Sequence, residues 1–194
     1  SRAMKQRFSS LLVVGVVVAV YLLGGFAPLE RGLTSLRFRL LAQEATGQVV
    51  VVGIDSQSLR TLNTWPWPRE YHGQLVDRLV AAGAHRIALD IDFSSTSNAH
   101  SDARFAEALA RAGGHVIMAT FKQPVRDENG AQIFMQTAPI PALARHTRLG
   151  HVNVQVEADS LVWRYSNFEN LGEFRLPGMA TLMAGQEQRA SRIF

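Results

Sequence analysis

The chain reads Trp65-Pro66-Trp67-Pro68-Arg69 between two apolar runs that each reach an aspartate, Val49-Val50-Val51-Val52-Gly53-Ile54-Asp55 and Ile87-Ala88-Leu89-Asp90-Ile91-Asp92-Phe93. Continuous apolar runs rich in β-branched residues are typical of strands buried on both faces of a parallel sheet. The two runs therefore predict strands over Val49–Ile54 and Arg86–Phe93.

Acidic residues that end such strands lie at the carboxyl edge of the sheet, where open α/β folds usually keep their ligand crevice. The two prolines fix φ on either side of Trp67, so the Trp-Pro loop is stiff and presents the Arg69 guanidinium beside indole faces. Either this loop contacts a ligand, or it is a rigid lid whose tryptophans close the core. We expect Asp90 or Asp92 to pair with Arg69 or to accept backbone hydrogen bonds, because a buried unpaired carboxylate is costly. The candidate ligand-binding residues are Asp55, Trp65, Trp67, Arg69, His72, Asp90, Asp92 and Ser94.

Beyond the Trp-Pro loop the pattern alternates between helix and strand. It predicts a helix from Glu70 to Ala82, a helix capped by Ser101 or Asp102, and a strand from His115 to Phe121. This order indicates an α/β fold with a mostly parallel central sheet flanked by helices. An antiparallel extension should follow, with a hairpin around 125–134, a short helix after Pro139 and Pro141, strands over 150–154 and 161–165, and a last helix from Pro177.

The amino-terminal part of the chain carries no charged residue from Phe8 to Leu29. About 20 apolar residues suffice for a helix to cross a membrane, so we expect one transmembrane helix over 8–29, in preference to a cleaved signal peptide. Leucines at helical spacing then predict a short amphipathic helix over 33–41. Basic residues flank the span on both sides, so the positive-inside count only slightly favours a cytoplasmic amino terminus.

Composition excludes several classes of protein. There is no cysteine, hence no disulfide, zinc-thiolate site or cysteine nucleophile. The net charge of +4 comes from arginines spread along the chain, which argues against nucleic-acid binding. The six histidines show no metal-ligand spacing, and no phosphate-binding glycine motif is present. We therefore expect neither a metal nor a cofactor.

Several motifs occur in an order that resembles the CHASE type-two family of extracellular sensory domains. They are Val52-Gly53-Ile54-Asp55, the Trp65–Arg69 block followed by His72, Ala82-Gly83-Ala84 before Ala88–Ser94, Gly150-His151-Val152-Asn153-Val154 with Val162 and Arg164, and Leu176-Pro177. The resemblance covers about residues 30–185.

This resemblance implies a sensory input domain of a bacterial receptor that faces the periplasm or cell exterior from the cytoplasmic membrane. Such receptors control a cytoplasmic output module: a cyclic-di-GMP cyclase or phosphodiesterase, an adenylate cyclase, or a kinase. We expect a cytoplasmic segment over 1–7, the span over 8–29, and a sensory domain over 30–194 that is incomplete at its carboxyl end. The family has no general ligand, so the signal is an unidentified small molecule or envelope condition.

Two other functions remain open. The domain could be a dimerisation or partner-recruitment module that binds no ligand; in either case we expect a homodimer joined through the span, helped by Gly15 and Ala19. The run 87–92 also looks like the nucleophile strand of haloacid-dehalogenase-type phosphatases. That chemistry needs a separately placed lysine and a downstream acidic pair. Lys122 is too close to Thr120 for this role, and no acidic pair closes a later strand. We therefore expect no enzymatic activity from this chain.

Overall fold

The computed structural model describes residues 12–21, 25, 27–41, 44–157, 160–171 and 174–186. The chain divides into two units, Ser1–Asp55 and Ser56–Phe194.

The described part of the first unit contains two helices and an irregular segment. Residues 12–21 are helical, and α2 spans Ala27–Leu40, which confirms the predicted amphipathic helix and extends it toward the amino terminus. The predicted strand over Val49–Ile54 is wrong: these residues are irregular, and Val51 is 88% exposed. A β-branched run becomes a strand only when a neighbouring strand supplies backbone hydrogen bonds, and the described residues of this unit include no such strand.

The predicted span over 8–29 is only partly described, since residues 8–11, 22–24 and 26 lie outside the described ranges. Among the described residues, no helix has both the length and the apolar character that crossing a membrane requires.

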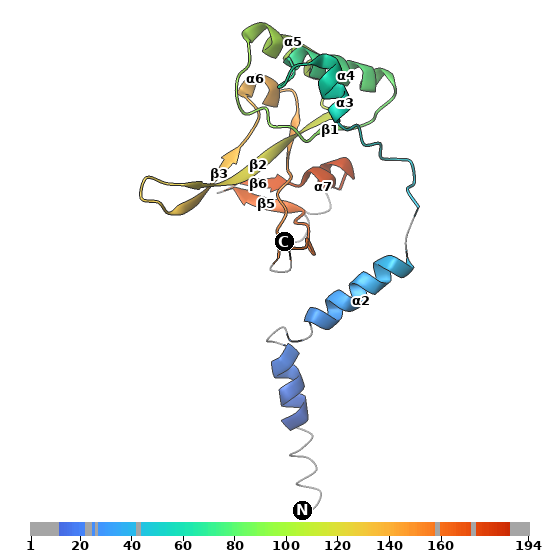
Figure 1. Cartoon of the computed structure of the whole chain (residues 1–194), viewed down its shortest axis with the longest axis vertical. Helices are drawn as coiled ribbons and strands as arrows, with labels where there is room; N and C mark the ends of the chain where they lie inside the picture. Colours follow the sequence, from blue (N-terminus) through green and yellow to red (C-terminus); the bar gives the residue numbers. More distant parts are fainter. Residues whose placement is uncertain are drawn as a thin grey trace, which may run out of the picture. The chain divides into compact units, whose positions relative to one another are not determined.

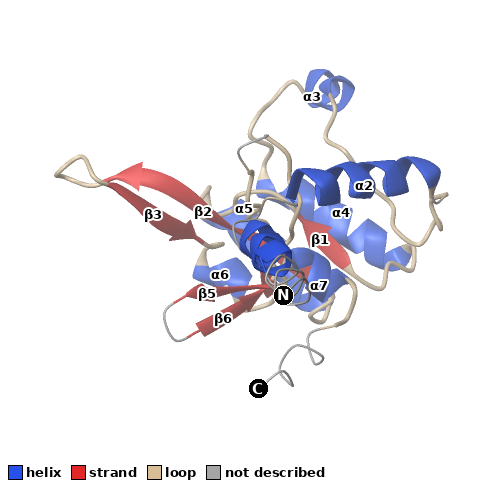
Figure 2. Ribbon diagram, turned by 90° about the horizontal axis from the view of Figure 1, so that it is seen from below, coloured by secondary structure: helices blue, strands red, loops and turns tan. Residues whose placement is uncertain are grey.

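The second unit is built on a sheet whose longest strand is β2, Val116–Arg126. The first half of β2 lies between two parallel neighbours, β1 (Ile87–Leu89) and β4 (Arg148–His151). Its second half pairs antiparallel with β3 (Gln132–Thr137) and forms a hairpin that extends away from the rest of the unit (Figures 1 and 2). The expected α/β class, the mostly parallel sheet and the hairpin are confirmed.

Two helices cover one face of this sheet and a shorter helix covers the other (Figure 1). The long helices are α4 (Arg69–Ala81) and α5 (Ala99–Arg111), which pack against the side of β2 that carries Val116 and Met118. The short helix is α7 (Met179–Met183), which packs on Ile117 and Ala119. Alternate residues of one strand thus supply two hydrophobic layers, as the period of a strand requires.

The close packing of α4 on α5 depends on Gly73. A Cβ at this position would lie 3.3 Å from the Ala108 Cβ and 3.4 Å from the Phe105 Cα. The missing side chain therefore lets the two helices approach with Phe105 fully buried between them and the sheet.

Several predicted boundaries shift. The strand predicted over Arg86–Phe93 ends at Leu89, and the one predicted over 150–154 is β4, which starts and ends earlier. The cap of α5 is Asn98, whose side chain accepts a hydrogen bond from the Ser101 N–H at 2.8 Å, and not Ser101 or Asp102. Asparagine is as good an N-cap residue as serine or aspartate. Because Asn98 follows a run of polar residues, the sequence alone did not single it out as the cap.

The remaining elements are partly as expected. The short helix after Pro139 is α6 (Pro141–Ala144), and the last predicted helix is α7. Helix α3 (Ser56–Leu62) precedes the Trp-Pro loop. The antiparallel strand predicted over 161–165 is irregular, and the antiparallel pair forms later as β5 (Phe168–Leu171) with β6 (Phe174–Pro177) (Figure 2).

Candidate functional site

The Trp-Pro loop leads directly into α4 and places its two indoles differently. Trp65 is 60% exposed, whereas Trp67 is half-buried, and their rings meet edge to face with centroids 5.9 Å apart. The Trp67 ring also lies 6.0 Å from the His72 ring, one turn into α4. Trp67 therefore packs against the core as the lid alternative expects, whereas Trp65 faces solvent and its contact with a ligand stays a prediction.

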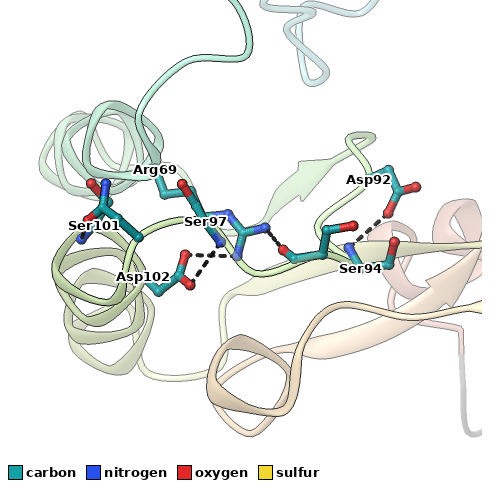
Figure 3. Close-up of polar contacts among 8 residues, drawn as sticks. Arg69, Asp92, Ser94, Ser97, Ser101 and Asp102 are labelled. Carbon is teal, nitrogen blue, oxygen red and sulfur yellow. Dashed lines mark hydrogen bonds and ion pairs between the residues drawn. The ribbon is translucent and has the colours of Figure 1, made fainter.

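Arg69 is the centre of the polar network and is buried (Figure 3). Its Nη1 lies 3.0 Å from Asp102 Oδ1, in an ion pair that lacks the angles of a hydrogen bond. Its Nη2 donates a hydrogen bond to the Ser95 carbonyl, and its Cζ lies 5.5 Å from the centre of the Phe93 ring. Arg69 thus joins the start of α4 to the loop that follows β1 and to the start of α5.

Asp102 occupies the first turn of α5, where a negative charge is favourable. Its Oδ2 accepts a hydrogen bond from the Ser97 N–H at 3.1 Å. One carboxylate therefore holds both the guanidinium and the backbone of the preceding loop (Figure 3).

His72 lies beneath this network in an aromatic cluster, with ring centroids 5.2 Å from Phe93 and 5.9 Å from Phe105. Burial, and then the charge of Arg69, lower the pKa of His72 below 6.5. The neutral, buried imidazole packs against Trp67 and Phe93 and so supports the loops that contain them. It is not available for contact with a ligand at the surface.

The expected pairing of Asp90 or Asp92 with Arg69 is wrong. Both carboxylates are exposed, because β1 ends at Leu89 and leaves them in a loop where they do not share a strand face. Asp92 accepts a backbone hydrogen bond from the Ser94 N–H at 2.8 Å (Figure 3). This contact confirms the other expectation for these carboxylates, that one of them accepts backbone hydrogen bonds. Asp55 belongs to the first unit.

A second polar cluster joins the middle of β2, the residues that follow β4, and β5, and the sequence pattern did not predict it. Glu169 accepts hydrogen bonds from Asn153 Nδ2 at 2.6 Å and from Lys122 Nζ at 3.1 Å. Burial opposes ionisation of Glu169, but these two donors outweigh it and hold the pKa of the carboxyl below its ordinary value. Asn153 lies in the family motif Gly150–Val154 and could have been singled out from the sequence. No sequence pattern pointed to its partner Glu169 in β5.

His151 belongs to the same cluster and is fully buried. Its ring stacks on Tyr165, with centroids 5.8 Å apart. Neither ring nitrogen makes a hydrogen bond of standard geometry to the described residues, although the Ser166 backbone is near enough to raise the pKa. Burial is the largest effect and lowers the pKa of His151 below 6.5, while Glu169 and Ser166 oppose it.

These lowered pKa values predict that the protein loses stability in acid. In the unfolded chain both histidines titrate near 6.5. Between their lower folded pKa values and 6.5, the unfolded state binds more protons, so the free energy of unfolding falls as the pH drops below about 6.5. Melting temperatures measured from about pH 8 to pH 5 should show this slope, with a smaller slope in His151→Gln or His72→Gln. The exposed His100 is the control, and His100→Gln should keep the full slope. A slope that neither buried substitution alters would contradict the prediction.

Among the described residues, no group of three or more histidine, aspartate or glutamate side chains is placed to hold a metal ion. Lys122 Nζ forms an ion pair with Glu169 Oε1 at 3.1 Å. The carboxyl edge of β1 carries the exposed carboxylates of Asp90 and Asp92 beside the loop that Arg69 holds through the Ser95 carbonyl.

The CHASE2 domain family model matches residues 12–193. The chain belongs to the CHASE2 family. CHASE2 domains are extracellular sensory domains of signalling receptors and are not catalytic, in agreement with the expected family and with the expected lack of enzymatic activity. No curated protein matches the chain, and no solved structure does.

Proposed function

We propose that this CHASE2 chain is the periplasmic sensory input of a bacterial transmembrane receptor, anchored in the cytoplasmic membrane through residues 8–29. The observation that supports the anchor is the helix over 12–21. The exposed fractions of its large apolar side chains run from 38% at Val20 to 67% at Tyr21. The helix has no polar face. A helix that is apolar all round needs an apolar environment on every side, and a lipid bilayer provides one.

The receptor's output is proposed from the family to which the chain belongs. A cytoplasmic cyclic-di-GMP cyclase or phosphodiesterase, an adenylate cyclase or a kinase would follow the sensory domain. Two copies would associate through the anchor, where Gly15 and Ala19 lie one turn apart and allow close helix approach. A signal would then act by its different affinity for two arrangements of the dimer.

The surface that faces the signal is proposed at the carboxyl edge of β1. There Trp65, Asp90 and Asp92 are exposed, and Ser94 is half-buried beside them in sequence. Arg69, His72 and Trp67 would hold this surface in shape from beneath, through the Ser95 carbonyl and the Phe93 ring. A rigid support is what a recognition loop needs in order to bind without losing much conformational entropy.

The hairpin favours partner recruitment as a second function. Ile133, Phe134 and Met135 of β3 are 47%, 60% and 52% exposed, and β3 is an edge strand among the described residues. Exposed apolar side chains on an edge strand are suited to the addition of a strand from another protein.

The orientation of the chain tests the main proposal. Asn129 lies at the exposed turn of the β2–β3 hairpin, so a cysteine introduced there adds the chain's single thiol. In intact cells, the Asn129→Cys protein is expected to react with a membrane-impermeant thiol reagent. The matched control is Ser1→Cys, which should react only after lysis. Labelling of Asn129→Cys that also requires lysis would refute the periplasmic placement.

A further inference from the structure

The hydrogen bonds of the β2–β3 hairpin show which of its backbone groups point outward. The Lys122 N–H points away from β3, because it donates to Asn153 Oδ1 at 2.9 Å. Bonded and non-bonded pairs alternate along an antiparallel ladder, so Lys122 and its register partner Gln136 form a non-hydrogen-bonded pair. The hydrogen bond from the Asp127 N–H to the Ala131 carbonyl, at 2.9 Å, agrees with this alternation.

The two outer edges of the hairpin therefore differ. The edge of β3 carries the backbone N–H and C=O groups of Gln132, Phe134 and Gln136, and the described residues place no second strand beside it. On the edge of β2, Pro124 occupies the outward position and has no N–H to donate. One edge of the hairpin is thus closed to strand addition, and the other is open.

The open edge lacks the features that usually keep edge strands apart, which are charged side chains, proline and bulges. β3 contains no charged residue and no proline, and its pairing with β2 runs without a bulge from Gln132 to Thr137. Lys122 of β2, whose Nζ lies 5.1 Å from the centre of the Phe134 ring, is paired with Glu169. The hairpin extends away from the rest of its unit (Figure 1), so a second hairpin can approach this edge.

The alternation of the backbone groups also fixes how two identical β3 strands would pair. In an antiparallel ladder, outward residues of one strand must lie opposite outward residues of the other. The register that uses all of them places Phe134 opposite the partner's Phe134, and Gln132 opposite the partner's Gln136. On the opposite face, Ile133 then meets the partner's Met135. Apolar side chains meet apolar ones and amides meet amides, and such cross-strand pairs stabilise a sheet.

We propose that β3 pairs with β3 of a second copy of this chain, antiparallel and centred on Phe134, so that two hairpins form one continuous sheet. The inference rests on the recruitment function proposed for the hairpin and names its partner. Both copies use the same surface, so the pairing closes into a dimer. A single strand pair buries little surface, so association is weak in dilute solution and increases where the copies are concentrated.

Disulfide cross-linking of the full 194-residue chain in detergent micelles tests this pairing. The chain contains no cysteine, so Phe134→Cys introduces a single thiol at the two-fold axis. Residues of a hydrogen-bonded antiparallel pair have Cα atoms about 5.5 Å apart, within the range of roughly 4.4–6.8 Å that a disulfide spans. In concentrated solution under mild oxidation, Phe134→Cys should form a covalent dimer at least about tenfold faster than a variant whose thiols cannot meet.

The matched control is Asn129→Cys, at the exposed turn of the same hairpin. In the proposed register the two turns lie at opposite ends of the joined strands, on the order of 30 Å apart. Asn129→Cys should therefore form covalent dimers only through random collisions. Equal rates of dimer formation by Phe134→Cys and Asn129→Cys would overturn the proposal.

Hydrogen exchange of the unsubstituted chain, followed by NMR, provides a second measurement. The Phe134 N–H should exchange more slowly as the chain concentration rises. The Met135 N–H is the internal control, since its hydrogen bond to β2 protects it at every concentration. Exchange at Phe134 that does not depend on concentration would also overturn self-pairing. It would leave recruitment of another protein by the hairpin, and the periplasmic placement tested by labelling in intact cells, unaffected.

Discussion

Replacement of Asp102 by alanine is expected to lower the free energy of unfolding by about 3–5 kcal/mol, the usual cost of removing one member of a buried ion pair. The side chains of Arg69 and Asp102 are only 9% and 11% exposed. Without the carboxylate, the Arg69 guanidinium would remain buried with its charge uncompensated. The Ser97 N–H would lose its acceptor as well. Chemical unfolding followed by circular dichroism measures this loss.

The control for this prediction is Asp90→Ala. Asp90 carries the same charge in the neighbouring loop but is exposed, so its removal should change the free energy of unfolding by less than about 0.5 kcal/mol. The double variant Arg69→Met/Asp102→Leu should recover much of the lost stability, because replacing both partners by apolar side chains leaves no buried charge. Equal effects of Asp102→Ala and Asp90→Ala would contradict the buried pairing.

The sequence pattern predicted the elements that have strong local signals. Helices α4 and α5 lie within a few residues of their predicted ranges, because apolar residues recur at helical spacing and glycines follow their ends. The parallel pairing of β1 with β2 followed from the alternation of strand and helix. Strand β4 was expected in the antiparallel extension and instead pairs parallel with β2.

The failures come from interactions between residues distant in sequence. Asp90, Asp92 and Asp102 were all possible ion-pair partners of Arg69. Spacing along the chain could not show that β1 ends before Asp90 and Asp92 and leaves them exposed. The apolar pattern could not distinguish residues 161–165 from 168–171, because a strand depends on the partner that it finds. The partnership of Asn153 with Glu169 was hidden for the same reason.

The structure shows which of the candidate site residues are buried and which are exposed. Arg69 and His72 were expected as ligand contacts and are buried supports, whereas Trp65, Asp90 and Asp92 are exposed and keep the role proposed for them. Burial decides whether a residue supports the loop or can contact a ligand. The packing of α4 and α5 on the sheet determines which residues are buried.

Replacement of Phe105 by alanine should also cost about 3–5 kcal/mol of unfolding free energy. Phe105 is fully buried, and its ring centre lies 5.2 Å from that of Phe93 and 5.9 Å from that of His72. The cavity would lie directly under the network that holds the carboxyl-edge loop. The exposed Phe134 is the matched control, and Phe134→Ala should cost less than about 0.5 kcal/mol. Denaturant titrations of the two variants would measure the difference, and similar midpoints would contradict the placement of Phe105.

The same substitution tests whether the aromatic cluster and the ion pair act as one support. The centre of the Phe93 ring lies 5.2 Å from that of Phe105 and 5.5 Å from the Arg69 Cζ. Residues that share a partner show interaction energies of about 0.5–3 kcal/mol in double-mutant cycles. The combined loss in Phe105→Ala/Asp102→Ala should therefore be smaller than the sum of the two single losses, because a cavity beside Phe93 lets water reach Arg69 and relieves its unpaired charge. Strict additivity would mean that the loop rests on two independent supports, and the rigid recognition surface would then depend on the Arg69–Asp102 pair alone.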